Sequence, residues 1–162
     1  MSHRYIVLEL CVGTLADVIN ETYKGPELSS DMTVLNEIAT GLAFIHSKKL
    51  VHRDIKPDNI LISSDGRIKL SDFGLCKETS TNHTFSVSGP LKGTLFWMAK
   101  ELLNVYNNNS IPVVKGSIKS DIFSAGCVFF YFVTRGIHPF GLADSIVRNI
   151  LADNIVNFDR NY

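Results

Sequence analysis

The sequence has few cysteines, no charge imbalance and no long hydrophobic run, and each shortage excludes a class of protein. Its three cysteines are an odd number and lack a metal-type pairing, so we expect reduced thiols in a cytosolic compartment, without a disulfide or zinc site. Lysine plus arginine and aspartate plus glutamate each number 16, so no overall field favours nucleic acid or an anionic membrane surface. The longest uncharged stretch, 122–134, is well short of the ~20 residues that cross a bilayer.

Short β-branched runs predict strands at two places in the chain. The apolar run 5–10 is typical of a strand, and it leads into a short helix, 15–19, with Thr14 as its cap. Two further apolar runs, 60–62 and 68–70, flank an Asp-Gly pair, which is a strong hairpin signal. With 45% of its 162 residues hydrophobic, the chain has enough apolar material for one core and is too short for two full domains.

Helical periodicity predicts two long helices separated by less regular sequence. The first covers residues 31–46, and its predicted apolar face consists of Met32, Leu35, Ile38, Ala39, Leu42 and Ile45. The second, 121–134, is apolar on nearly every side, so we expect a fully buried helix with Gly136 at its C-terminal cap. Residues 142–152 are a weaker helix candidate, and the Thr-, Ser- and Asn-rich stretch 75–96 is typical of a long surface loop.

The most informative pattern is the segment from His52 to Asn59, followed beyond the predicted hairpin by Asp72-Phe73-Gly74. This spacing supplies a candidate base and two candidate magnesium ligands in the order that phosphoryl transfer uses. Any one of these polar residues alone would more simply be part of a turn. Eight consecutive matching positions, a hairpin and a second motif in the expected order make coincidence a poor explanation.

Each polar residue of the two motifs has a predicted role in phosphoryl transfer from ATP. Asp54 is the predicted base that takes the proton of the attacking hydroxyl, and Lys56 is expected to point at the transferring phosphate. The amide oxygen of Asn59 and the carboxylate of Asp72 are predicted to hold Mg²⁺, a hard ion that prefers oxygen ligands. The predicted cofactors are therefore ATP and Mg²⁺.

With these motifs the sequence resembles the hinge and C-terminal lobe of a eukaryotic protein kinase. Lys56 and the pair Gly93-Thr94 ahead of Trp97-Met98-Ala99 resemble the serine/threonine branch. A closer resemblance is to the inositol-requiring kinase/endoribonuclease of the unfolded-protein response. It rests on segments 8–11, 72–77, 121–128 and 138–141 and extends from about residue 3 to about residue 152.

The resemblance implies a mainly α (α+β) fold over residues 3–162, a protein-kinase-like large lobe with a hinge strand and a short β-hairpin and without the small lobe. It implies that Glu9 and Cys11 present backbone groups to adenine, that Leu61 forms the apolar floor under the ring, and that Asp121 braces the catalytic loop. For Leu61 an ordinary core role stays an open alternative. The residues expected to bind nucleotide or metal are Glu9, Cys11, Lys56, Asn59, Leu61 and Asp72.

The resemblance also implies partners and regulation. The expected partners are ATP, a protein substrate or the chain itself as acceptor, and a second copy of the chain in a homodimer. In the family the kinase domain lies on the cytosolic face of the endoplasmic reticulum membrane. Thr84, Ser86 and Ser88 occupy positions where the family is phosphorylated, and a phosphate there would pair with Arg53. A merely solvated Ser/Thr loop is the alternative.

The sequence departs from the family pattern at two points. Ala99-Lys100-Glu101 has a lysine where the family has proline, which affects peptide docking more than nucleotide chemistry. The glycine-rich loop, the small lobe and the nuclease domain of the family are not found, so we expect an open adenine pocket and no RNA cleavage. Two other hypotheses therefore stay open, a catalytically silent pseudokinase-like docking module and a truncated product without an independent role.

Overall fold

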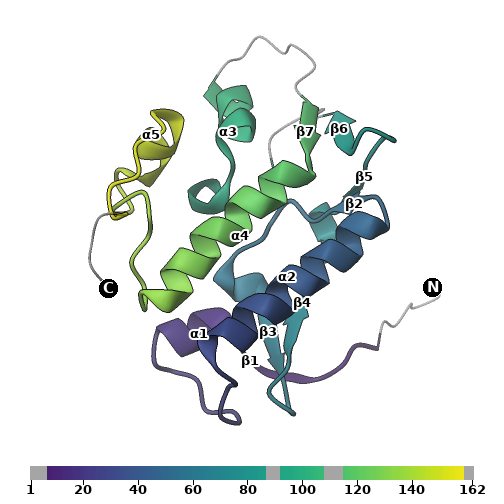
Figure 1. The fold of residues 1–162 in the computed structure, drawn as a ribbon, viewed down its shortest axis with the longest axis vertical. Helices are drawn as coiled ribbons and strands as arrows, with labels where there is room; N and C mark the ends of the chain where they lie inside the picture. The colour runs from purple at the N-terminus through teal and green to yellow at the C-terminus, as the bar shows by residue number, and fades with distance from the viewer. Residues whose placement is uncertain (1–6, 87–91, 108–114, 159–162) are drawn as a thin grey trace, which may run out of the picture.

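Helices and small antiparallel sheets make up residues 7–86, 92–107 and 115–158, the part of the chain that the computed structural model describes (Figure 1). The two long helices, α2 (Asp31–Ser47) and α4 (Ile118–Val133), pack against each other across the middle of the molecule. Strands β1 (Cys11–Thr14), β3 (Ile60–Ser63) and β4 (Ile68–Leu70) form one sheet in the order β1-β3-β4, and β4 contacts α2. The helical and hairpin content expected from the sequence is present.

The first strand lies further along the chain than predicted. Residues 7–10 have no regular structure, β1 covers Cys11–Thr14, and residues 5 and 6 lie outside the described part. The residues that pair with β3 therefore come just after the apolar run 5–10. Cys11 pairs with Ser63, and Thr14 pairs with Leu61. Thr14 then caps α1 (Leu15–Ile19) in a reciprocal capping box with Asp17, which confirms the predicted cap.

The predicted hairpin is formed by β3 and β4. Ile60 pairs with Leu70, and Ile62 with Ile68, and Gly66 in the connecting turn takes a φ of +79°. Ser63 fixes the turn, because its hydroxyl donates to the Arg67 carbonyl at 2.9 Å. Glu37 of α2 accepts the Ile68 N–H at 2.8 Å, so the hairpin is tied to the long helix.

The apolar face of α2 is confirmed in its centre and wrong at its edges. Val34, Ile38, Leu42 and Ile45 are the buried residues of α2, at helical spacing. Met32 is 73% exposed and Ala39 is also exposed, so neither belongs to the core. Because successive positions rotate by about 100°, Met32 and Ala39 lie roughly 140° and 120° around the helix from a face centred on Val34 and Ile38, so both point away from it.

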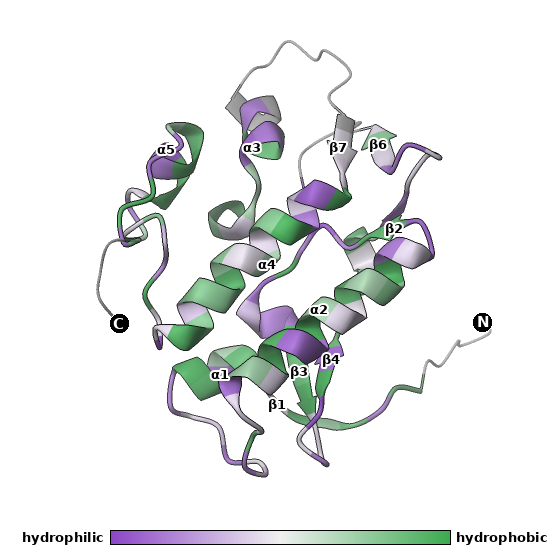
Figure 2. Cartoon of the chain, viewed as in Figure 1, coloured by the Kyte–Doolittle hydropathy of each residue, from purple (hydrophilic) through white to green (hydrophobic). Residues whose placement is uncertain are grey.

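Helix α4 is not buried on every side as the composition suggested. It begins at Ile118, with Ser117 as its N-cap, and ends at Val133, with Thr134 as its C-cap, so Gly136 lies just beyond the cap. Ile122 and Val133 are 56% and 47% exposed, so one side of the helix is open. Figure 2 shows hydrophobic residues over much of the helix. Composition alone cannot tell which side of such a helix lacks a cover.

Residues 75–96 carry short strands rather than an unstructured loop. Strand β5 (Lys77–Glu78) pairs with β2 (Leu50–Val51), and β6 (Thr84–Ser86) pairs with β7 (Lys115–Ser117). Residues 87–91, which include the predicted phosphorylation site Ser88, lie outside the described part. The pairing partners are distant in sequence, so local composition could not reveal them.

Two hydrophobic clusters share α4. Leu15, Ile38, Ala125 and Phe132 belong to the cluster between α1, α2 and α4. The other cluster contains Cys127 of α4, and its remaining buried members are Val51, Phe85, Met98, Leu102, Leu103, Phe140, Ile146 and Ile150, the last two from α5. The fold is completed by three short 3₁₀ helices and two further α-helices. The 3₁₀ helices are η1 (Pro57–Asn59), η2 (Phe73–Leu75) and η3 (Leu95–Trp97), and the α-helices are α3 (Lys100–Asn107) and α5 (Ile146–Leu151). Helix α5 is shorter than the predicted helix 142–152. None of the helices described is long and apolar enough to cross a bilayer.

Candidate active site

Asp54 lies in a buried polar network between β2 and η1. Its carboxylate is 9% exposed, and Oδ2 accepts a hydrogen bond from Asn59 Nδ2 at 2.9 Å. The same Nδ2 donates to the Asp54 backbone carbonyl at 2.9 Å, which holds the two predicted site residues together. Because Nδ2 already donates to Asp54, the side-chain amide oxygen of Asn59, Oδ1, is the atom that can bind a cation.

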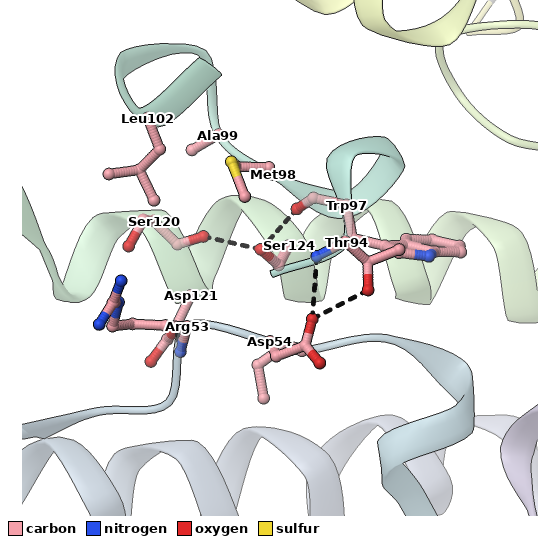
Figure 3. A pocket seen from close by; sticks show the side chains of 11 residues that line it. Arg53, Asp54, Thr94, Trp97, Met98, Ala99, Leu102, Ser120, Asp121 and Ser124 are labelled. Atoms are coloured by element: carbon pink, nitrogen blue, oxygen red, sulfur yellow. Dashed lines mark hydrogen bonds between the residues drawn. The ribbon is translucent and has the colours of Figure 1, made fainter. Parts of the chain in front are cut away.

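Lys56 and Thr94 complete the surroundings of the Asp54 carboxylate. Lys56 Nζ lies 3.3 Å from Asp54 Oδ2 and donates to Thr94 Oγ1 at 3.0 Å. Asp54 Oδ1 accepts from both the backbone N–H and the hydroxyl of Thr94, at 3.1 and 3.0 Å (Figure 3). Gly93 allows this close approach, because its φ is +124° and a Cβ there would lie 3.0 Å from the Arg53 carbonyl oxygen.

Asp121 fixes the backbone of the segment that carries Asp54. This residue of α4 is 1% exposed, and its carboxylate accepts the backbone N–H groups of His52 and Arg53 at 2.8 and 2.9 Å. His46 Nε2, at the end of α2, lies 2.9 Å from Asp121 Oδ2. The contact implied for Asp121 is therefore present, and α2 and α4 both hold the loop through one carboxylate.

Arg53 adopts a conformation that is uncommon for a residue with a side chain. Its φ is +73°, and its guanidinium lies over the ring of Phe85 in β6, 5.1 Å from the ring centroid. Burial lowers the pKa of Arg53, and the nearby Asp121 carboxylate opposes this shift. In the described part of the chain the buried Arg53 Nε forms no hydrogen bond, whereas Nη1 donates to the Leu75 carbonyl at 3.3 Å. The pairing of Arg53 with a phosphate on Thr84, Ser86 or Ser88 stays a prediction.

Asp72 stands outside the buried network. It is exposed, its backbone is left-handed with φ 59° and ψ 65°, and Oδ1 accepts from Gly74 N–H at 3.3 Å. The neighbouring Ser71 links it to the loop, since the Ser71 N–H and hydroxyl both donate to the Asn59 carbonyl at 3.0 Å. His52 adds a second link, through its Nε2, 2.8 Å from the Ser71 carbonyl, and its ring, 5.1 Å from that of Phe73.

A cavity of about 510 Å³ brings the other predicted nucleotide residues together. Its lining includes Glu9 just ahead of β1, Cys11 at the start of β1, Leu61 of β3 and Asp72, which follows β4. Lys69 also lines it, with Nζ 3.1 Å from Glu9 Oε2. The volume lies within the range of small-molecule sites, so the cavity is large enough for a nucleotide.

A much smaller cavity lies beside the Asp54 loop (Figure 3). It has about 10 Å³ of space, and its lining includes Arg53, Asp54 and Thr94 together with Ser120 and Ser124 of α4. Ser124 Oγ donates to the Trp97 carbonyl at 2.6 Å and ties α4 to the segment after Thr94. Because this space barely admits one water, it is a packing gap rather than a binding site.

The residues predicted to hold a cation have suitable chemistry. Asn59 offers an amide oxygen, and Asp72 offers a carboxylate that accepts one described hydrogen bond. Hard cations such as Mg²⁺ bind to one or two carboxylates together with phosphate oxygens. No group of three or more His, Cys, Asp or Glu side chains able to hold a metal occurs in the described ranges. A site completed by phosphate oxygens does not need such a group.

The sequence matches known proteins along almost its whole length. The pattern of the protein kinase domain family matches residues 1–160. The chain belongs to the protein kinase family. The resemblance to its inositol-requiring members is confirmed, because the chain is 43% identical over 159 residues to the human serine/threonine-protein kinase/endoribonuclease IRE2, covering 91% of this chain and 16% of the relative.

Two other relatives are of the same type. The Caenorhabditis elegans serine/threonine-protein kinase/endoribonuclease ire-1 is 37% identical over 151 residues, covering 85% of this chain and 14% of the relative. The Schizosaccharomyces pombe sensor for unfolded proteins in the ER, ire1, is 36% identical over 176 residues, covering 93% and 16%. The kinase chain thus spans about one sixth of the length of these relatives.

Sequence reasoning missed several residues of this kinase site. Thr94 was read only as a mark of the serine/threonine branch, yet it donates twice to Asp54. His46 lies 75 positions from its partner Asp121, and no local pattern signals such a pair. Lys69 lies between two apolar residues of β4, and no motif marks it as part of a site. Only the folded arrangement brings these side chains to the site.

Proposed function

We propose that this chain carries the catalytic residues of a serine/threonine protein kinase that transfers phosphate from ATP to protein hydroxyls and depends on Mg²⁺. The observation that carries the proposal is the network in which Asp54 contacts Lys56, Asn59 and Thr94. The cavity lined by Glu9, Cys11, Leu61 and Asp72 supports it, because a nucleotide there would lie beside the Asp72 carboxylate. We infer that residues 3–162 contain the hinge and C-terminal lobe of a kinase domain.

Asp54 is the proposed base of the reaction. Its Oδ1 is oriented by Thr94 and its Oδ2 by Asn59 and Lys56, so the carboxylate keeps one position when a substrate hydroxyl arrives. Lys56 is 22% exposed and can turn its ammonium from Asp54 to the transferring phosphate, where a cation offsets the negative charge that develops. The acceptor proton passes to Asp54 as the hydroxyl oxygen bonds to phosphorus and the bond to the nucleoside diphosphate breaks.

Asn59 and Asp72 are the proposed ligands of Mg²⁺, which when bound neutralises charge on the phosphate oxygens. Backbone groups at Glu9 and Cys11 are proposed to bind the adenine edge, with Leu61 under the ring. Leu61 is half-buried and lines the cavity, which is compatible with either the floor role or a packing role.

The biological role follows from the type of relative. We infer that the chain acts in a response to unfolded proteins, because a relative is named a sensor for unfolded proteins in the ER. The same proposal includes the phosphate acceptor, which is a protein substrate or a second copy of the chain. It also includes a homodimer and a position on the cytosolic face of the endoplasmic reticulum membrane. Lys100, the first residue of α3, pairs its ammonium with the carboxylate of Asp153, which follows α5.

Phosphate transfer by the purified chain tests the proposal. The chain is incubated with Mg²⁺ and γ-labelled ATP, with a serine-rich protein as acceptor, alongside the variants Asp54→Asn and Asp58→Asn. Asp58 is exposed in the same segment and serves as the matched control. Asp54→Asn should lower transfer at least about a hundredfold, whereas Asp58→Asn should retain it.

Two outcomes would count against the proposal. Equal transfer by the wild-type chain and Asp54→Asn would remove Asp54 from its role. A chain that binds a protein partner but transfers no phosphate under any nucleotide and metal condition would instead favour the silent docking module.

A further inference from the structure

The side chain of Phe85 in β6 connects a distant segment to the loop of the proposed base. Strand β6 pairs with β7, which lies just ahead of α4, and the two strands lie side by side (Figure 1). Phe85 is 4% exposed and belongs to the hydrophobic cluster that contains Cys127. Its neighbours in the strand are half-buried at Thr84 and exposed at Ser86. The Phe85 ring is therefore the part of β6 that reaches into the core.

The position of this ring is set by contacts within the chain. Phe85 pairs with Gly116 of β7, and a Cβ at Gly116 would lie 2.1 Å from Cζ of the ring. Only glycine leaves room for the ring at this point. Lys77 Nζ donates to the Ser86 carbonyl at 2.7 Å, so the end of β6 is tied to β5, which is itself paired with β2. The ring thus keeps its place through neighbouring strands.

Arg53 has an unfavourable conformation that the surroundings must hold. Its φ of +73° lies in the left-handed region, and backbone outliers of this kind persist only where other contacts fix them. The Arg53 N–H donates to Asp121 at 2.9 Å. On the guanidinium, Nη1 donates to the Leu75 carbonyl at 3.3 Å, and the buried Nε has no hydrogen-bond partner in the ranges that the structure describes.

The Phe85 ring supplies an attraction that these hydrogen bonds do not. The guanidinium carbon of Arg53 lies over the ring, 5.1 Å from its centroid, within the ~6 Å range of a cation–π contact. Such a contact is stronger where water is excluded, and here the ring is buried. Because Arg53 directly precedes Asp54, a shift of the guanidinium would move the backbone that carries the proposed base.

We propose that Phe85 is a positioning residue for Asp54, because its ring holds the Arg53 guanidinium, and with it the backbone at Asp54, through a cation–π contact. A phosphate on Thr84 or Ser86 is not required for this anchor, since the face of the ring provides the attraction. The inference rests on the proposed function of Asp54 and deepens it by naming a residue on which that function depends. A packing role for Phe85 alone would not depend on the electrons of its ring.

Fluorination of the ring tests the contact, because fluorine withdraws negative charge from the ring face and changes the ring's size only slightly. Pentafluorophenylalanine replaces Phe85 in the full chain, and initial rates of phosphate transfer give kcat and the KM for ATP. The kcat should fall about fivefold. The KM for ATP should stay within about twofold of wild type, since Phe85 does not line the cavity that is proposed to bind nucleotide.

The same replacement at Phe140 is the matched control. Phe140 is 7% exposed and belongs to the same cluster, and its described ring contacts are with Phe123 and His138 rather than with an arginine or lysine. Fluorination there should leave kcat unchanged. Urea midpoints of both fluorinated chains show whether they are folded to the same extent.

Gly116→Ala tests the anchor without any change to Phe85 or Arg53. The added methyl group cannot share the space of the ring, so the ring must leave its place beside the guanidinium. Gly126→Ala in α4 is the control, because a Cβ at Gly126 meets nothing within 4 Å. Gly116→Ala should lower kcat by at least about fivefold, whereas Gly126→Ala should retain it.

Nuclear magnetic resonance follows the anchor without catalysis. In the isotope-labelled full chain, the Nε–H signal of Arg53 is assigned by its loss in Arg53→Lys, and hydrogen exchange of the Arg53 backbone N–H is measured beside it. Fluorination at Phe85 and Gly116→Ala should both move the Nε–H signal and speed the exchange at least about fivefold. Neither change is expected for fluorination at Phe140 or for Gly126→Ala.

The two readouts separate this inference from the proposed function. An unmoved Arg53 signal after fluorination at Phe85 would overturn the anchor, and so would a moved signal with unchanged kcat in a chain that transfers phosphate. If no chain transfers phosphate while the Arg53 signal and exchange change as expected, the kinase proposal fails and the anchoring of the Arg53 backbone by Phe85 is supported.

Discussion

The two aspartates of the predicted chemistry lie in opposite environments. Asp54 is 9% exposed and is contacted by Lys56, Asn59 and Thr94. Asp72 is exposed, and its carboxylate accepts one described hydrogen bond, from Gly74. The surroundings of Asp54, the proposed base, are thus organised by the folded chain, whereas the carboxylate of Asp72, a proposed metal ligand, is open to solvent.

This difference has a chemical reason. A base must hold one orientation toward an incoming hydroxyl, so protein donors around its carboxylate are useful before substrate binds. A magnesium ligand must keep its oxygens available for the cation, which prefers to complete its shell with phosphate and water. We expect changes on the base side to affect stability and changes on the metal side to affect ligand binding with little cost to the fold.

The largest expected effect on stability is at Asp121, which supports the base side. Asp121→Ala leaves the buried N–H groups of His52 and Arg53 without an acceptor, so we expect a loss of about 3 kcal/mol in the free energy of unfolding. Urea denaturation measures the loss. Asp153→Asn, at a residue whose side chain is 73% exposed and paired with Lys100 and whose φ of 53° suits asparagine, is the control and should cost less than about 1 kcal/mol. Equal urea midpoints for Asp121→Ala and wild type would show that this carboxylate does not hold the loop.

Asp72→Asn tests the opposite expectation on the metal side. Asparagine tolerates the left-handed backbone at position 72, so the free energy of unfolding should change by less than about 0.5 kcal/mol. Calorimetric titration with ATP, in the presence and absence of Mg²⁺, should show that the gain in affinity from Mg²⁺ falls at least about tenfold. A variant that unfolds readily, or one that keeps the full magnesium effect, would break the proposed contrast between the two aspartates.

Local patterns in the sequence were sufficient where a short segment determines its own structure. The Thr14 cap, the hairpin at residues 60–70 and the extent of α2 are confirmed, because capping, turn chemistry and helical period are local properties. The motif around Asp54 also predicted that Asn59 would lie nearby, and the two are hydrogen-bonded. The roles of these residues in catalysis stay predictions.

The rest of the site depends on contacts between distant parts of the chain. Thr94 reaches Asp54 from 40 positions away, and His46 and His52 meet Asp121 across 75 and 69 positions. The pairing of β6 with β7 is equally non-local, so the stretch 75–96 looked like a loop. An apolar composition likewise predicted a buried α4, although Ile122 and Val133 are exposed, because composition does not specify which neighbours cover a helix.

His138, which is 6% exposed, extends the comparison to a buried imidazole. Burial lowers its pKa from the ordinary value of 6.5 to about 4, and the Phe96 backbone carbonyl opposes the shift. The unfolded chain therefore binds more protons than the folded chain between these values, so stability falls as pH falls below about 6.5. Between about pH 7 and about pH 5 the loss should be about 2 kcal/mol.

Replacing the imidazole should remove this pH dependence. Urea midpoints of His138→Phe, measured across the same pH range, should decline less steeply than those of wild type by about that amount. His83→Asn is the control, because His83 is exposed and its φ of 55° suits asparagine. Parallel profiles for His138→Phe and wild type would mean that His138 titrates alike in both states.

The smallest effect is expected for the ion pair at the cavity that is proposed to bind nucleotide. Lys69 and Glu9 have side chains that are 41% and 57% exposed, so water screens their attraction despite the 3.1 Å separation. Lys69→Gln should lower the free energy of unfolding by no more than about 0.5 kcal/mol, and the difference should disappear in about 0.5 M sodium chloride. Urea curves at two salt concentrations measure it. A loss above about 1 kcal/mol that persists in salt would mean that the open side of the site is held as firmly as the side around Asp54.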